Sequence, residues 1–504
     1  QIDKRNADSA LVFLNKIKSV EPDIEKVLNS NINTNMKKAF IETCQLIADA
    51  NLMKFNETRD IVLVNEAIVH LKKAEETLSV NQSGYKNQYD RIKDASVTKE
   101  LYKRAVDAYY QLYTVTNKQQ FVDSAFYYSE LSKSAALMES VNDNLAIQST
   151  NIPDSLSIGI ESLRNQLSFI TTKINGLEKA GDLSEKDSTS LSYFKLQKIT
   201  TTDSLESKLL FVRGNFSNYY DANFRNSTIS IAEIQQQLKT DELAIEYLVG
   251  VDQLFRFTIA HNSVALETLP LTLESEVSKF QKIFQPEYFM ANEKSAYKNF
   301  IKQSHYLFSK LIPEFSKYSD TTRLYIIPDK HLNFLPFELL ISASQEKGLY
   351  NYKNLNYLVK DYNISYGYSS TLLFDKHQGA SRPERSIPRL LAVAPSYKDI
   401  LTDTIRLAQL GEYRDGFEEL YYNKEEVGSI GSYFNSKVLS GSQATESAVM
   451  EVIKDYNILH FAMHALVDNE NSENSKFIFT NSRDSLDDSF LHNYELYNTS
   501  LNCD

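Results

Sequence analysis

The spacing of apolar residues changes once along the chain, near residue 240, and this change limits the folds open to it. From residue 1 to about 225, apolar residues recur at three- and four-residue steps, Pro22 and Pro153 are the only prolines, and glycines are scarce. After residue 240, β-branched and aromatic residues alternate with others along short runs. A period near 3.6 is typical of amphipathic helices, and a period of two is typical of strands. The sequence therefore predicts a multidomain protein in which an all-α region precedes an α/β region.

The first region contains candidate pairs of antiparallel helices. Residues 100–117 and 121–141 form one such pair, joined by a short polar turn and carrying small alanines among tyrosines and phenylalanines. Pairs of this kind resemble tetratricopeptide repeats (TPRs), whose period is about 34 residues. A plain helical bundle is the alternative, because aromatic stripes at helical spacing also arise from ordinary helix packing. We expect TPR-like helical repeats over 1–145 and long antiparallel linker helices over 146–228.

The second region alternates candidate strands with candidate helices. Residues 243–271 indicate three strands separated by two turns. Further strands are expected at 323–329, 363–369, 389–396, 436–441, 457–463 and 475–480, with helices at 295–312, 423–434 and 445–453. Such alternation is typical of a largely parallel sheet covered on both faces. We expect this α/β architecture over 229–504.

Composition narrows the choice of partners and location. The chain of 504 residues has 54 Lys and Arg against 66 Asp and Glu, so its net charge of −12 has the wrong sign for wrapping nucleic acid. The sequence contains no run of about 18 apolar residues, the length that a membrane-spanning helix needs. The two cysteines, Cys44 and Cys503, do not make a disulfide framework. We expect a cytoplasmic protein with no nucleic-acid partner. Because the chain lacks an initiator Met and stops after the loop-like "NTSLNCD", we also expect it to be a fragment.

The stretch "IPDKHLNFLPFELL" (327–340) joins a strand to an apolar segment. Its Leu332, Leu335 and Phe337 are expected to anchor this connection by packing. His331 is expected to be a surface or hydrogen-bonded residue and not a catalyst.

A second junction, "SGSQATESAVMEVI" (440–453), follows a strand with Gly441 and places Thr445 before a helix. A strand, a glycine loop and a helix can bind an anion. This stretch lacks the glycine patterns of P-loops and dinucleotide-binding folds, so we expect Thr445 to act as an N-cap. No cofactor is expected.

The stretch "NILHFAMHALVD" (457–468) carries two histidines, His460 and His464. A zinc peptidase motif would need a glutamate directly after the first histidine, on a helix, and this chain has Phe461 there in a strand-like run. We therefore expect no metal site. His460 is expected to be buried within the strand. His464 is expected at the carboxyl edge of the sheet, where α/β proteins place ligands and catalytic residues, so it is the candidate base.

Taken in order, the stretches "PDKHLNFLPFELL", "LSGSQATESAV", "ILHFAMHALVD" and "DSFLHNYELYNTSLN" closely resemble the CHAT domain. This caspase-like domain follows TPR arrays in many bacterial proteins, and the resemblance spans roughly residues 230–504. It implies a Cys–His dyad that hydrolyses peptide bonds. His464 matches the catalytic histidine of the family. Ala465 replaces the usual glycine after it, and its backbone amide would be one of the oxyanion donors.

The nucleophile implied by this resemblance is a cysteine that follows the histidine by about 50 residues in caspases. Cys503 follows His464 by 39 residues, but it comes after the loop-like "YNTSLN" and not after a buried strand. We therefore expect the nucleophile beyond Asp504. Cys44 lies in a predicted helix and is expected to be a core thiol.

Three hypotheses about function remain open on the sequence. The first is a caspase-like cysteine endopeptidase that acts on a protein substrate and receives a protein partner or activator through its helical repeats; this fragment would be inactive. The second is a non-catalytic TPR and CHAT scaffold that acts by protein–protein interaction. The third is an α/β domain of another kind.

Overall fold

The computed structural model describes most of the chain, and the statements below concern those residues. They are 34–82, 88–133, 153–179, 184–215, 228–284, 293–314, 318, 321–343, 351–374, 388–398, 418–467, 475–482, 489–499 and 501. The chain divides into two compact units, which we describe separately. The first unit combines Gln1–Glu139 with Asn226–Gln378, and the second combines Ser140–Arg225 with Gly379–Asp504.

The first unit begins with long helices packed as neighbours. They are α3 (Thr34–Thr58), α4 (Ile61–Gln82), α5 (Gln88–Thr116) and a further helical stretch over 119–133. α3 packs along α4, and α4 along α5, through small buried alanines that let the helices approach closely. Arg59 (φ 59°) and Asn117 (φ 54°) reverse the chain in the left-handed conformation after α3 and α5. The predicted helical region is confirmed, and its assignment to TPRs stays a prediction.

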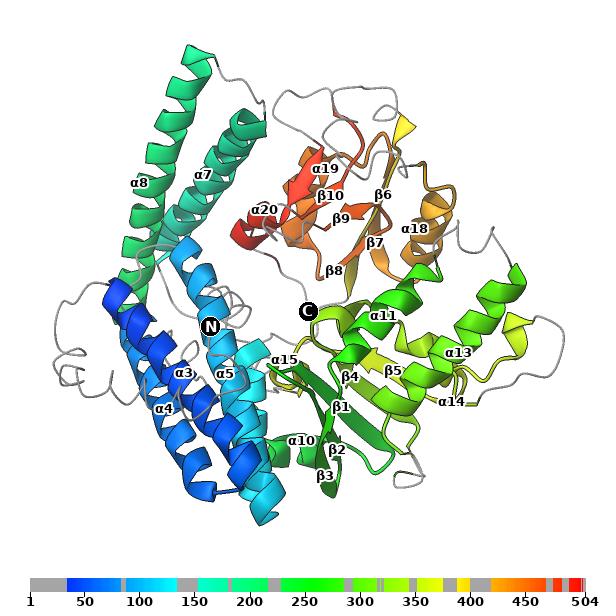
Figure 1. Cartoon of the computed structure of the whole chain (residues 1–504). Helices are drawn as coiled ribbons and strands as arrows, with labels where there is room; N and C mark the ends of the chain where they lie inside the picture. The colour runs from blue at the N-terminus through cyan, green and yellow to red at the C-terminus, as the bar shows by residue number, and fades with distance from the viewer. Residues whose placement is uncertain are drawn as a thin grey trace. The chain divides into compact units, whose positions relative to one another are not determined.

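A five-stranded sheet follows these helices in the same unit (Figure 1). Its order is β3 (Ser263–Leu269), β2 (Leu254–Ala260), β1 (Glu242–Val249), β4 (Arg323–Ile327) and β5 (Asn363–Tyr366). β1, β4 and β5 are parallel, whereas β2 is antiparallel to both β1 and β3. The prediction of a largely parallel sheet is therefore wrong for this sheet, which is mixed. The reason is local. The turns after β1 and β2 have only a few residues, and such short turns can join neighbouring strands only when these are antiparallel.

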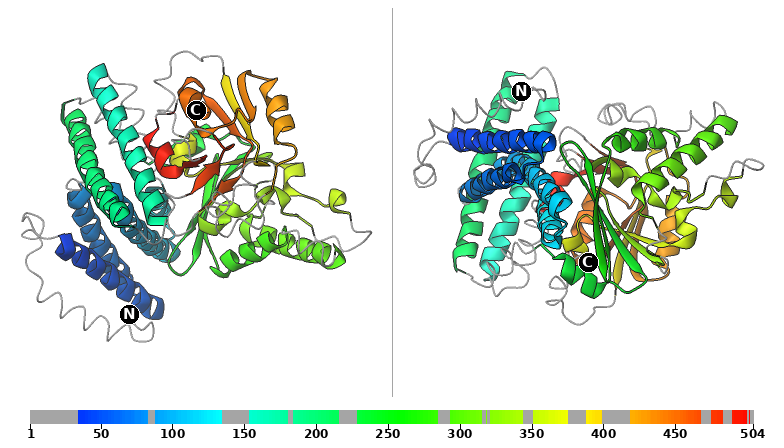
Figure 2. Two further views of the ribbon diagram at one scale, coloured as in Figure 1. Left: turned by 90° about the horizontal axis from the view of Figure 1, so that it is seen from above. Right: turned by 60° about the horizontal axis from the view of Figure 1, so that its bottom comes forward.

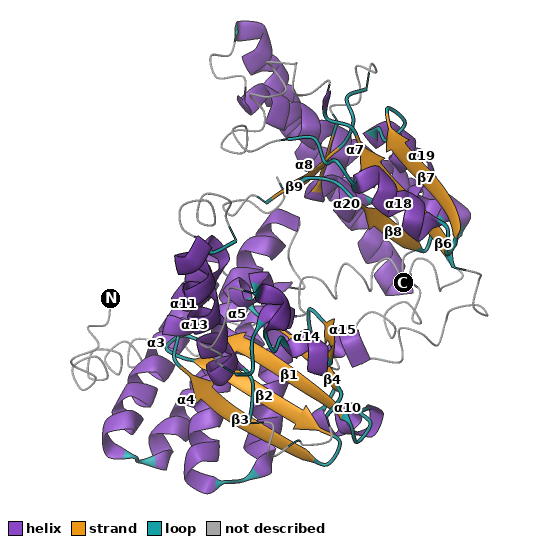
Figure 3. Cartoon of the chain, turned by 90° about the vertical axis from the view of Figure 1, so that its right-hand side faces the viewer, coloured by secondary structure: helices purple, strands orange, loops and turns teal. Residues whose placement is uncertain are grey.

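Both faces of this sheet are covered (Figures 1 and 3). β1 is buried along its whole length, and its residues alternate between two cores. Leu243, Ile245 and Tyr247 pack with α11 (Thr272–Lys282) and α13 (Glu293–Leu311). Ala244 and Leu248 pack into the core formed by the N-terminal helices. This alternation places Glu246, which lies between Ala244 and Leu248, on the side of those helices.

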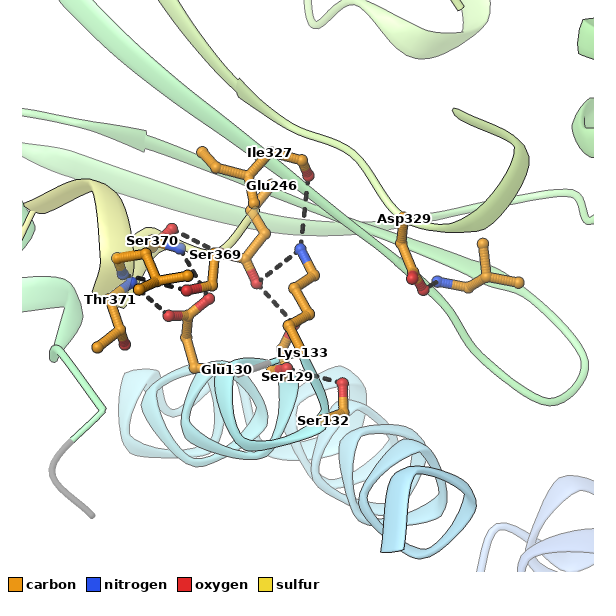
Figure 4. A network of polar contacts seen from close by, with 12 residues as sticks. Ser129, Glu130, Ser132, Lys133, Glu246, Ile327, Asp329, Ser369, Ser370 and Thr371 are labelled. Carbon is orange, nitrogen blue, oxygen red and sulfur yellow. Dashed lines mark hydrogen bonds and ion pairs between the residues drawn. The ribbon is translucent and has the colours of Figure 1, made fainter. Parts of the chain in front are cut away.

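A buried polar network joins the N-terminal helices to the sheet (Figure 4). Lys133, from the helical stretch 119–133, lies 3.3 Å from the Glu246 carboxylate, and both side chains are almost fully buried. Glu246 also accepts hydrogen bonds from the hydroxyls of Ser129 (2.7 Å) and Ser370 (2.6 Å). Glu130 accepts the backbone N–H groups of Ser370 and Thr371 at the start of α15 (Ser370–Phe374). The polar groups of this junction are thus satisfied inside the core, as buried polar groups must be.

Shorter elements complete the first unit. They are the helices α10 (Ile231–Gln237) and α14 (Leu358–Asp361) and the 3₁₀ turns η2 (Lys330–Phe334), η3 (Phe337–Leu339) and η4 (Tyr352–Asn354).

The second unit contains a long helical hairpin and two small sheets. α7 (Asp154–Lys179) and α8 (Glu185–Asn215) pack side by side and are drawn in teal in Figure 2. One sheet is parallel, with the order β7 (Asn435–Gly441), β6 (Arg389–Pro395), β8 (Ile458–Phe461). The other is antiparallel, with the order β11 (Phe490–His492), β10 (Lys476–Ile478), β9 (Ala465–Leu466).

Short helices flank these sheets in the second unit. They are α18 (Asn423–Gly431), α19 (Glu446–Val452), the turn η7 (Ile453–Asp455) and α20 (Asn493–Asn498). Within the described part of the chain, no helix combines the length and the apolar character needed to cross a membrane.

Candidate active site

The carboxyl edge of the parallel sheet in the second unit carries His464. β8 ends at Phe461, the N–H of Ala462 still bonds to the carbonyl of Val393 in β6 (2.9 Å), and His464 follows two residues later. The side chain of Asn423, the first residue of α18, reaches the carbonyl of Pro395 at the end of β6 (2.8 Å). His464 therefore lies where the sequence places it, and its catalytic role stays a prediction.

The imidazole of His464 is partly buried and has a defined partner. Its Nε2 atom lies 2.8 Å from the backbone carbonyl oxygen of Glu418. A carbonyl oxygen can only accept a hydrogen bond, so Nε2 must carry the proton. In the neutral ring the lone pair then belongs to Nδ1. This contact makes Nδ1 the basic nitrogen of His464.

Tyr397, two residues past the end of β6, holds His464 from a second side. Its buried ring lies 4.9 Å from the imidazole, centroid to centroid, at an angle of 52°. Its hydroxyl accepts the backbone N–H of His464 (2.9 Å) and donates to the carbonyl of Ile478 (3.2 Å). Burial raises the pKa of Tyr397 above its ordinary value, so the hydroxyl keeps its proton across the physiological range.

The hydrogen-bond ladder between β9 and β10 determines the direction in which the N–H group of Ala465 points. The N–H of Ile478 bonds to the carbonyl of His464 (3.0 Å), so these two residues form a hydrogen-bonded pair. The next pair, Ala465 with Phe477, is then a non-hydrogen-bonded pair. The N–H of Ala465 therefore points away from β10, an orientation suited to an oxyanion donor. That role stays a prediction.

His460 differs from the expectation of a core histidine. It lies within β8 as predicted, but its side chain is 31% exposed and its Nε2 atom lies 2.8 Å from the Glu426 carboxylate on α18. The prediction of burial is wrong because this strand lies at the edge of a three-stranded sheet and its residues are only partly covered. The two histidines thus have different partners, a carboxylate for His460 and a carbonyl for His464.

The packing role expected for the stretch 327–340 is confirmed. Leu332, Leu335 and Phe337 are buried, and His331 is exposed.

The second motif forms the expected cap. The Thr445 side chain accepts the N–H of Ala448 (3.2 Å) and caps α19. Gly441 has φ +58°, which favours glycine at the end of β7.

The structure describes one of the two cysteines, Cys44. Cys44 is buried in α3, in agreement with a core thiol. Cys503 and Asp504 lie outside the described residues.

Tyr397, Glu418 and Glu419 were not identified from the sequence. Tyr397 lies two residues past the carboxyl end of β6, so the rule that selects His464 also applies to it. Glu418 contributes a backbone atom, which no side-chain pattern reveals.

Comparison with known proteins gives a family match for part of the chain. A search of the curated proteins found no match. The family model of the CHAT domain matches residues 302–503, a range that includes β4, the motif around Phe337, β6 and His464. This part of the chain is therefore similar to the CHAT domain family.

Proposed function

We propose that the CHAT domain of this chain is a caspase-like cysteine endopeptidase in which His464 is the general acid and base. One observation carries the proposal: the Glu418 carbonyl fixes the proton on Nε2 of His464 and leaves Nδ1 as the base at the carboxyl edge of the sheet. A base whose tautomer is set by a third group is a recurring arrangement in nucleophilic catalysis.

The proposed reaction begins when Nδ1 of His464 takes the proton of a cysteine thiol. The thiolate attacks the peptide carbonyl carbon, a C–S bond forms, and the carbonyl oxygen becomes an oxyanion that accepts the N–H of Ala465. The imidazolium then returns the proton to the leaving nitrogen as the C–N bond breaks. Water, deprotonated by the same nitrogen, hydrolyses the thioester and releases the thiol and a carboxylate product.

The cysteine in this scheme is the one that the sequence analysis expects beyond Asp504. Cys503 is the alternative, and its substitution by serine separates the two. Cys44 is a packing thiol in α3 and has no part in the proposal.

We further propose that residues 229–504 act as one peptidase domain. The family match begins at residue 302, but residues Glu242–Glu246 of β1 pair with β4 inside the match, which supports an earlier start. The helices of residues 34–133 would receive a protein partner or activator. Support for this role comes from Lys133 and Glu130, which tie those helices to β1 and α15.

A peptide library tests the peptidase proposal. A chain extended past Asp504 by the residues that follow in its gene should cleave peptides, and His464→Ala should lower kcat/KM by about 100-fold or more. His460→Ala is the matched control, because it removes the other histidine of the same segment and should leave cleavage unchanged. The peptidase proposal fails if His464→Ala cleaves as well as the parent.

A further inference from the structure

Glu419 holds the short segment that carries the Glu418 carbonyl. Its carboxylate accepts two hydrogen bonds from consecutive residues just past β6, the hydroxyl of Ser396 (2.9 Å) and the backbone N–H of Tyr397 (2.7 Å). Hydrogen bonds to an ionised carboxylate are about twice as strong as neutral ones. The segment beginning at residue 418 is therefore fixed to the end of β6 one residue away from the carbonyl that bonds His464.

Tyr397 lies between this anchor and the histidine. Its N–H is held by Glu419, while its hydroxyl bridges the N–H of His464 and the carbonyl of Ile478. In the ladder of β9 and β10, the hydrogen-bonded pair of His464 and Ile478 would normally exchange both bonds directly. Here only the bond from the N–H of Ile478 to the carbonyl of His464 is direct, and the Tyr397 hydroxyl bridges the other two groups. The backbone and the ring of His464 are thus positioned by the same few residues.

The end of β6 is itself fixed from the other side. The N–H of Ser396 bonds to the hydroxyl of Thr480 (2.9 Å), which donates to the carbonyl of Gly441 at the end of β7 (2.7 Å). Glu419 therefore binds to a sheet edge at which Thr480 bridges the ends of β6 and β7. Removing its carboxylate would release residues 418–420 without unfolding the sheet.

We propose that Glu419 is a positioning residue that sets the tautomer of His464 through the Glu418 carbonyl and the orientation of its ring through Tyr397. Its catalytic consequence rests on the proposed function, but the tautomer itself does not. The exposed side chain of Glu418 takes no part, because the backbone carbonyl makes the contact.

Nuclear magnetic resonance of imidazole nitrogens tests the proposal directly. The chain has eight histidines, and the signals of His464 are assigned as those lost in His464→Ala. In the parent, Nε2 should carry the proton and Nδ1 should show the shift of an unprotonated nitrogen. In Glu419→Ala, both tautomers should be populated. Tyr397→Phe, which keeps the ring and loses only the bridging hydroxyl, should also move the His464 signals.

Glu426→Ala is the matched control, since this glutamate on α18 bonds the other histidine of the segment, His460, directly through its carboxylate. It should move the His460 signals and leave those of His464 in place. An unchanged His464 tautomer in a folded Glu419→Ala protein would overturn the proposal. If Glu419→Ala does not fold, Glu419→Gln, which keeps the size and one acceptor oxygen, takes its place, and an unchanged tautomer there counts equally against it.

Activity gives a second and separate readout. In an active extended chain, Glu419→Gln should lower kcat by about 10- to 100-fold with little change in KM, because it misplaces a reacting group and not the substrate. A shifted tautomer in a chain that cleaves nothing supports the positioning role and contradicts the peptidase. Cleavage with an unshifted tautomer contradicts the positioning role alone.

Discussion

Lys133 and Glu246 form a buried ion pair with 3.3 Å between the ammonium nitrogen and the carboxylate. Lys133 belongs to the N-terminal helices and Glu246 to the first strand of the five-stranded sheet, so the pair joins two regions that lie far apart in the sequence. Glu130 lies beside it, so one buried cation serves two buried carboxylates. This imbalance of charge gives two predictions about stability.

Loss of the cation should destabilise the first unit strongly. Lys133→Met removes the ammonium group that pairs with the buried Glu246 carboxylate, and we expect the free energy of unfolding to fall by about 3–5 kcal/mol. Urea unfolding measures this change. The matched control is Lys279→Met, which breaks an exposed pair with Glu276 and should cost less than about 1 kcal/mol. Equal effects of the two substitutions would contradict the account of the network.

The stability of this junction should depend on pH. Burial, followed by the neighbouring Glu246 carboxylate, raises the pKa of Glu130 from 4.5 to about 8, against the opposing effect of Lys133. The folded chain therefore holds this proton more tightly than the unfolded chain. Its contribution to stability is complete below about pH 4.5 and is lost as the pH rises through about 8.

Hydrogen exchange at the N–H groups of Ser370 and Thr371, which Glu130 holds, reports on this junction. After correction for intrinsic exchange, their protection should fall between about pH 5 and 8. Glu246→Gln removes the like charge and should flatten that fall. A slope that is the same in both proteins would argue against the effect of Glu246 on the pKa of Glu130.

The connection after β4 should depend on packing and not on its histidine. Phe337 is fully buried, and Phe337→Ala should lower the free energy of unfolding by about 3–5 kcal/mol. His331→Ala, six residues earlier and exposed, should change it by no more than about 0.5 kcal/mol. Thermal unfolding of the two variants distinguishes them, and a large effect of His331→Ala would contradict the packing role.

Two glycines near the candidate site should respond in opposite ways to alanine. Gly441 has φ +58°, so Gly441→Ala should cost about 1 kcal/mol even though the nearest atoms belong to the flexible end of Lys424. Gly428 lies in α18 with nothing within 4 Å of an added Cβ, so Gly428→Ala should stabilise by up to about 1 kcal/mol. Unfolding midpoints of the two variants, compared with the parent, check both signs.

The sequence predicts those parts of the fold that depend on local periodicity. The alternation over 243–271 gives β1, β2 and β3, and the helical spacing after Pro153 gives the hairpin of α7 and α8. The prediction of strand direction is wrong for the five-stranded sheet because the short turns after β1 and β2, and not the helices between later strands, decide the direction of β2 and β3. Turn length is the physical quantity that decides this, and it was present in the sequence.

Only part of the candidate site can be predicted from the sequence. His464 was found because a strand ends just before it. Glu419 and Tyr397 come from 45 and 67 residues earlier, and the Tyr397 hydroxyl meets the N–H of His464 only once β6 and β8 are neighbours. Glu130 and Lys133 were equally hidden, because charged residues three apart on a helix usually face solvent.

The most direct test of the account is the labelling of a cysteine by a peptide ketone that reacts with activated thiols. The chain extended past Asp504 is treated with the probe, and the labelled residue is identified by mass spectrometry in the parent, His464→Ala and His460→Ala. We predict one labelled cysteine, not Cys44, in the parent and in His460→Ala, and at least about tenfold slower labelling in His464→Ala. Labelling at the same rate in His464→Ala, or no labelling in the parent, would contradict the role of His464 as the base of a cysteine peptidase.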